Sequence, residues 1–171
     1  SSGNVAAVET HADQINQLQA ALLTAVQQNL DDCRDAFLEV SLGTASGIWI
    51  FAEHENGAVK PVVFELLAKA QELKAHNGEN ITAVLLGANV AGLAPELIAR
   101  GADEVIVAED EALAEYSARP YQQALSQLAK KYKPSILLYG ATELGRDLAP
   151  RLMNDLHTGL TADAIDLGYD E

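Results

Sequence analysis

The chain has 171 residues, of which 25 are acidic and 11 basic, so its formal net charge at pH 7 is −14. This charge argues against nucleic-acid and anionic-membrane partners, because phosphate groups attract clusters of Lys and Arg. The single cysteine, Cys33, excludes an internal disulfide and a cysteine-based zinc or iron–sulfur site within these residues. No apolar run reaches the ~18 residues that span a bilayer, and a reducing compartment is the expectation because only one cysteine is present.

Residues 12–41 are predicted to form one long helix. No Gly or Pro interrupts them, and apolar side chains recur at steps of three and four, including Cys33 as a packing residue. Residues 43–47 end the helix, so we divide the chain into an N-terminal helical extension, 1–43, and an α/β domain, 44–171. The apolar stripe must be buried against the rest of the chain or a partner, and self-association through it is one hypothesis.

After the joint, short apolar runs alternate with amphipathic helical stretches. The runs at 48–52, 81–86, 104–107 and 135–139 are predicted strands, and helices are expected at 61–77, 90–100, 119–132 and 142–156, before an extended segment at 162–167. Continuous apolar strands separated by helices are typical of a parallel sheet covered on both faces. The sequence therefore predicts an α/β fold: a doubly wound, mostly parallel open sheet with helices on both faces, preceded by a long N-terminal helix. Its function is expected at the carboxyl ends of the strands.

The loops at these strand ends contain no familiar phosphate or catalytic motif. Neither Gly-x-Gly-x-x-Gly nor Gly-x-x-x-x-Gly-Lys-Ser/Thr is present, and the turn after the first strand carries Glu53, His54 and Glu55 where a phosphate would lie. These three residues, and the acidic run at 109–111, are interpreted as solvated loops rather than cation sites. No metal site is predicted, because no two histidines have ligand spacing and all are expected near the surface at His11, His54, His76 and His157.

The segment from 140 to 163 has a more specific pattern. Thr142 is placed to cap the last helix, and Pro150 lies inside that helix, where a kink or a restart is expected. Asp147 and Arg151 are four residues apart and can form an ion pair. From the chemistry alone, Arg146, Asp147 and Arg151 fit either a surface network or a site for an anion or a partner.

This segment resembles the alpha subunit of the electron-transfer flavoproteins. The resemblance rests on "ATELGRDLAPRL" at 141–152 and "TGLTAD" at 158–163, with support from "WIFAEHENGAVKPVVFELLAKAQEL" at 49–73 and "GADEVIVAED" at 101–110. It covers about residues 47–169 and does not include the N-terminal helix. The motif residues carried over onto this sequence are Thr142, Gly145, Arg146, Asp147, Pro150, Arg151, Thr158, Gly159, Thr161 and Asp163.

The resemblance implies a redox role without catalysis by this domain itself. The family's alpha subunit holds its FAD mainly in a C-terminal domain and in contact with the beta subunit. That C-terminal domain is expected to lie beyond these residues, so no cofactor site is expected in them. The domain would scaffold the heterodimer and contact the beta subunit through the motif residues. The intact protein would pass electrons from dehydrogenases or NADH to a quinone oxidoreductase or another acceptor. The alternative from the residues alone is a nucleotide-binding α/β enzyme or sensor with an unrecognised phosphate loop.

Overall fold

The computed structural model describes residues 45–169. The predicted helix at 12–41, with Cys33 and His11, lies outside the described residues. The joint between the two predicted domains is described only from residue 45 onward.

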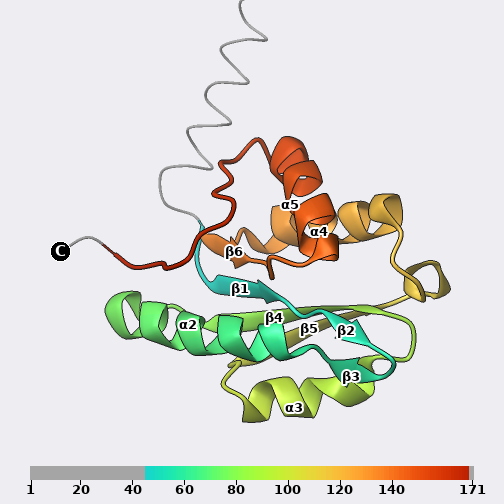
Figure 1. The fold of residues 1–171 in the computed structure, drawn as a ribbon, viewed down its shortest axis with the longest axis horizontal. Coiled ribbons are helices and arrows are strands. Elements are labelled where there is room, and N and C mark those ends of the chain that lie inside the picture. The colour runs from blue at the N-terminus through green and yellow to red at the C-terminus, as the bar shows by residue number, and fades with distance from the viewer. Residues whose placement is uncertain (1–44, 170–171) are drawn as a thin grey trace, which may run out of the picture. The chain divides into compact units, whose positions relative to one another are not determined.

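A four-stranded parallel sheet forms the centre of the described region (Figure 1). Its strands are β1 (Ile48–Phe51), β4 (Ile81–Gly87), β5 (Glu104–Glu109) and β6 (Ile136–Leu138), in the order β5-β4-β1-β6. β1 pairs with β4 on one side and with β6 on the other, so that Ile48 lies opposite both Ile81 and Ile136. The predicted parallel, doubly wound sheet is confirmed.

Helices cover both faces of this sheet, which explains why the central strands β1 and β4 are buried at every position. All four residues of β1 and all seven of β4 are buried. Side chains alternate between the faces, so Ile48 and Ile50 join one apolar core while Trp49 and Phe51 join the other. The first core is completed by α2 (Pro61–Asn77) and α3 (Ala94–Ala99), and the second by α4 (Ala118–Tyr132) and α5 (Glu143–Leu156). Figure 1 shows these two layers on opposite sides of β1.

Three local features differ from the expectations. The turn after β1 is a small antiparallel hairpin, β2 (His54–Glu55) and β3 (Ala58–Val59), in which Asn56 and Gly57 both have positive φ, as a tight hairpin requires. Residues 162–167, expected to be extended, form no strand in the described structure. Of the kink or restart expected at Pro150, the restart is absent: α5 continues through this residue, which is exposed.

Short 3₁₀ helices complete the connections. η1 (Ala91–Leu93) precedes α3, and η2 (Glu111–Leu113) follows β5, where a loop was expected. Within residues 45–169 there is no helix with the length and apolar character that crossing a membrane demands.

Candidate functional site

The strand order places a crevice at the carboxyl ends of β1 and β6. The chain proceeds from β1 to β4 and β5 on one side, and β6 lies on the other side of β1. In open α/β sheets, ligands bind where the strand order reverses in this way. Glu53 follows β1 at this point, and Gly140 and Thr142 lie between β6 and α5.

Glu53 is buried at this point. Its position in a loop had suggested instead that its side chain is solvated. Only 2% of the residue is exposed. Its Oε1 accepts a hydrogen bond from the Thr142 hydroxyl at 2.7 Å, and the Lys60 ammonium lies 3.8 Å from its Oε2. Oε2 has no hydrogen-bond partner in the described structure. A buried carboxylate is stabilised only by such contacts, so the interpretation of Glu53 as part of a solvated loop is wrong.

Thr142 connects this carboxylate to the last helix. Its hydroxyl oxygen accepts a hydrogen bond from the Gly145 amide at 3.0 Å, so the predicted N-cap is confirmed. The same hydroxyl donates its proton to Glu53. One side chain therefore links the end of β1 with the beginning of α5.

Two glycines allow α5 to approach the sheet closely. A Cβ atom at Gly145 would lie 2.0 Å from the Gly140 carbonyl oxygen, which is shorter than any van der Waals contact. A Cβ atom at Gly140 would lie 3.0 Å from both the Glu53 carboxylate and the Val62 side chain. The backbone at Gly140 is thus in close contact with the beginning of α5 and with the Glu53 and Val62 side chains.

Arg146, Asp147 and Arg151 lie on the accessible side of α5. The predicted pair is present, with Arg151 Nη2 3.0 Å from Asp147 Oδ1. Tyr116, which the sequence did not single out, donates from its hydroxyl to Asp147 Oδ2 at 2.7 Å. This hydrogen bond and then the Arg151 contact lower the pKa of Asp147, while burial and then the same hydrogen bond raise the pKa of Tyr116. Tyr116, which lies in a loop 31 positions before Asp147, thus helps to fix the orientation of the Asp147 carboxylate beside Arg151.

The motif residues after α5 lie on an exposed segment. Asp163 accepts a hydrogen bond from Arg146 at 2.9 Å, which ties this segment to the first turns of α5. Thr158, Gly159 and Thr161 are exposed, as is Pro150. The structure therefore brings together Arg146 with Asp163, Asp147 with Arg151, and Thr142 with Gly145, but not the whole motif.

Two other polar residues at the carboxyl edge have structural partners. Glu109, interpreted as solvated, accepts hydrogen bonds from the amides of Val90 and Ala91 at 2.6 and 2.8 Å. His54, expected at the surface, is half-buried, with its Nε2 2.8 Å from the Leu86 carbonyl oxygen. Across residues 45–169, no three side chains of His, Cys, Asp or Glu are grouped so that they could hold a metal ion.

Sequence comparisons match most of the described residues to known proteins. The profile of the family described as "Electron transfer flavoprotein domain" matches residues 48–171. The chain is 50% identical over 124 residues to the electron transfer flavoprotein subunit alpha of Thermoanaerobacterium thermosaccharolyticum, covering 72% of this chain and 38% of that protein. It is 44% identical over 124 residues to the same subunit of Clostridium acetobutylicum, covering 72% and 37%.

Some relatives have names that place them in enzyme complexes. Subunit LctC of a lactate dehydrogenase (NAD(+),ferredoxin) from Acetobacterium woodii is 42% identical over 125 residues, covering 73% of this chain and 30% of that protein. The chain thus spans well under half the length of the curated relatives it matches.

Proposed function

The chain belongs to the electron transfer flavoprotein family, and from this premise we propose that residues 44–171 act as the scaffold domain of an alpha-type subunit that contacts a beta-type subunit. The intact protein would carry electrons from a dehydrogenase or NADH to a quinone oxidoreductase or another acceptor. Residues 1–43 would form a separate helical extension.

The buried Glu53 carboxylate is the observation that carries this proposal. It lies at the point of the sheet where nucleotides bind in related architectures, and it is held there by Thr142 and Lys60. A phosphate placed beside it would meet a negative charge and a crevice packed by Gly140 and Gly145. The described residues therefore do not fit the pyrophosphate of FAD at this position, and they support a scaffold role rather than a nucleotide-binding one.

The proposed contact surface lies on the exposed side of α5. Arg146, Asp147 and Arg151 present both charges there, and the bond from Arg146 to Asp163 adds the segment that follows the helix. Interspersed opposite charges give an interface its orientation and its choice of partner. Because this charged surface rests on the packed end of α5, its geometry is set before a partner binds.

The relatives' names support a carrier rather than a catalyst. LctC is a subunit of a lactate dehydrogenase, and a 38% identical relative from Anaerotignum propionicum is an electron transfer subunit of acryloyl-CoA reductase. By analogy, this domain would assemble a carrier that serves a separate dehydrogenase or reductase. We place it in the cytoplasm, or in the mitochondrial matrix if the source is eukaryotic.

Co-purification with a beta-type subunit of the family tests the contact. The wild-type chain is expected to elute with this subunit, and Arg146→Ala is expected to weaken the complex about tenfold, as for a charged contact at an interface. Arg119→Ala, an exposed arginine on α4, is the matched control and should have no effect. Equal binding by wild-type and Arg146→Ala proteins would remove Arg146 from the interface.

Calorimetry separates the scaffold role from nucleotide binding. The chain alone is expected to give no tight binding to AMP, ATP, FAD or NADH, and to purify without visible flavin absorbance. Stoichiometric flavin, or saturable binding of any of these nucleotides, would favour the alternative of a nucleotide-binding domain.

The division at residue 43 is tested by deletion. If residues 44–171 are an independent domain, the shortened chain should keep a cooperative unfolding transition. Light scattering before and after the deletion shows whether residues 1–43 mediate self-association. If they do, the full chain has the mass of an oligomer and the shortened chain has the mass of a monomer.

A further inference from the structure

The outer edge of β5 (Glu104–Glu109) is open in the part of the chain that the structure describes. β5 pairs with β4 on one side, and no described strand lies on its other side. The amide and carbonyl groups along such an edge are a template for a further strand. In the order β5-β4-β1-β6 this edge lies farthest from β6, which leads into α5, so it is separate from the contact surface proposed above.

The side chains of β5 are less buried than those of the neighbouring strand. All seven residues of β4 are buried, whereas the four apolar residues in the middle of β5 are only partly buried. Val105 and Val107 pack against the first core, and Ile106 and Ala108 pack against the second. A strand added beside β5 would therefore remove apolar surface from water on both faces of the sheet, besides pairing the backbone.

β5 lacks the features that usually protect an edge strand from pairing. Protected edges are short or carry Pro, Lys or a bulge. β5 has six residues, contains neither Pro nor Lys, and pairs with β4 in one continuous register from Thr82 opposite Glu104 to Gly87 opposite Glu109. β6, at the other edge, has only three residues and begins two positions after Pro134. Of the two edges of this sheet, that of β5 is thus better suited to accept another strand.

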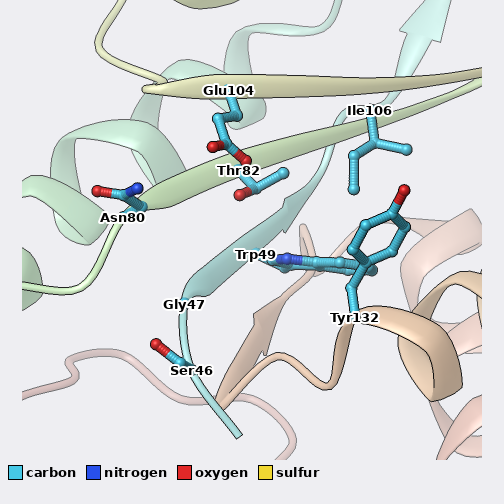
Figure 2. Close-up of a pocket in the computed structure, with 8 residues that line it drawn as sticks. All are labelled: Ser46, Gly47, Trp49, Asn80, Thr82, Glu104, Ile106 and Tyr132. Atoms are coloured by element: carbon cyan, nitrogen blue, oxygen red, sulfur yellow. The ribbon is translucent and has the colours of Figure 1, made fainter.

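One face of β5 also has space beside it. Figure 2 shows Glu104 and Ile106 on the same side of the sheet as Thr82, where they line a recess of about 360 Å³. The helix α4 contributes only its last residue, Tyr132, to the lining of this recess. Side chains of an added strand that point to this face therefore have room beside β5.

The charges at this edge select the strand that can join it. Glu104 is exposed at the beginning of β5, and the ion pairs within residues 45–169 do not include it. Glu109, Asp110 and Glu111 are exposed at the other end. A second copy added antiparallel and in register would place Glu104 of each copy opposite Glu109 of the other, and like charges in that position destabilise a sheet. A strand with basic residues at its ends and apolar residues between them is complementary to this edge.

We propose that the outer edge of β5 binds an extended segment of a partner polypeptide as an added strand, with Lys or Arg at both ends of the segment and β-branched residues between them. Hydrogen bonds between the two backbones supply the affinity, and the basic residues set the register against the acidic residues at the two ends of β5. The added strand lies three strand spacings, about 14 Å, from β1, so the buried Trp49 takes no part in binding.

Hydrogen–deuterium exchange of the full chain with the capped peptide Lys-Thr-Val-Val-Val-Lys tests this proposal. The peptide is expected to slow exchange in residues 104–109 saturably, because amides at the open edge become hydrogen-bonded, and to leave residues 143–151 of α5 unchanged. Added salt should weaken binding, since charges are screened. Two comparison peptides should bind at least about tenfold more weakly: Glu-Thr-Val-Val-Val-Glu, which reverses the charges, and Lys-Thr-Val-Pro-Val-Lys, in which proline interrupts the backbone pairing.

A charge reversal in the chain locates the contact. Glu104→Lys is expected to bind the lysine peptide about fivefold more weakly than the wild type does, and to bind the glutamate peptide more tightly than the wild type does. Glu65→Lys, at an exposed position on α2, is the matched control and should bind like the wild type. The proposal is overturned if the lysine peptide protects no residue of β5, if the proline peptide binds equally well, or if Glu104→Lys binds both charged peptides like the wild type. It is also overturned if exchange in residues 104–109 slows with chain concentration alone, since a second copy would then occupy the edge.

Discussion

The Thr142 hydroxyl donates a hydrogen bond of 2.7 Å to the buried Glu53 carboxylate and at the same time accepts one from the first turn of α5. These two residues are 89 positions apart. Their contact joins the carboxyl end of β1 to the helix that carries the family motif. The orientation of the charged side chains on α5 therefore depends on a residue outside that motif.

Substitution of Glu53 tests this dependence through stability. Glu53→Ala removes the acceptor of Thr142 and leaves a buried cavity, and we expect a loss of about 3 kcal/mol in the free energy of unfolding. Glu53→Gln keeps an acceptor oxygen and should lose only about 1 kcal/mol. Urea denaturation provides the measurement, with the exposed Glu55→Ala as the control. If Glu53→Ala and Glu55→Ala unfold at the same urea concentration, the buried network contributes nothing.

The cap at Thr142 is tested by hydroxyl removal at nearly constant volume. Thr142→Val loses both hydrogen bonds and is expected to cost about 2 kcal/mol, whereas Thr142→Ser keeps them and should stay within about 0.5 kcal/mol of wild type. Thr158→Val at an exposed position is the control. Helix content and urea midpoints are measured together. A Thr142→Val protein as stable as Thr142→Ser would show that the cap is unimportant.

Gly145 gives a prediction that opposes helix propensity. Alanine favours a helix over glycine by about 1 kcal/mol, so propensity alone predicts that Gly145→Ala stabilises the chain. The new Cβ atom would instead lie 2.0 Å from the Gly140 carbonyl oxygen, and backbone must move. We expect a net loss of at least about 2 kcal/mol by thermal or urea unfolding. Gly159→Ala, with no atom within 4 Å of its Cβ, is the control and should be neutral.

Asp103 makes stability depend on acid pH. The Ile81 amide, and then Lys74, lower the pKa of Asp103 from its ordinary value of 3.8. Because the pKa is lower in the folded chain, this contribution is present above pH 3.8 and is lost as the pH falls below that value. Urea midpoints of wild type and Asp103→Asn should therefore differ at pH 7, and the difference should become smaller as the pH is lowered below 3.8. A constant difference across this pH range would contradict the charge effect.

Sequence periodicity was sufficient for the architecture. The run 48–52 is apolar at every position, as in a strand covered on both faces, so a buried strand of a parallel sheet was expected there, and β1 is such a strand. Pro61 and Gly78 mark the two ends of α2 by backbone chemistry alone, and the structure places them at those ends. Thr142 was likewise identified because an N-cap is a local interaction.

The burial and the contacts of the polar side chains at the site were harder to predict from the sequence. Glu53 was interpreted as solvated because it follows a strand and is acidic, but its burial depends on Thr142 and Lys60, and Thr142 is distant in the chain. One signal pointed to burial, namely that Glu53 directly continues the apolar run of β1. Tyr116 gave no signal, since its bond to Asp147 crosses 31 positions.

The amino-acid sequence by itself determined the alternation of strands and helices, the cap of α5 and the family motif, because each depends on neighbours within a few residues or on a recognisable pattern. Only the tertiary structure decided which polar groups are buried and which are exposed. That decision depends on the desolvation and pairing of groups far apart in the chain, such as Glu53 with Thr142, and strand order brings them together.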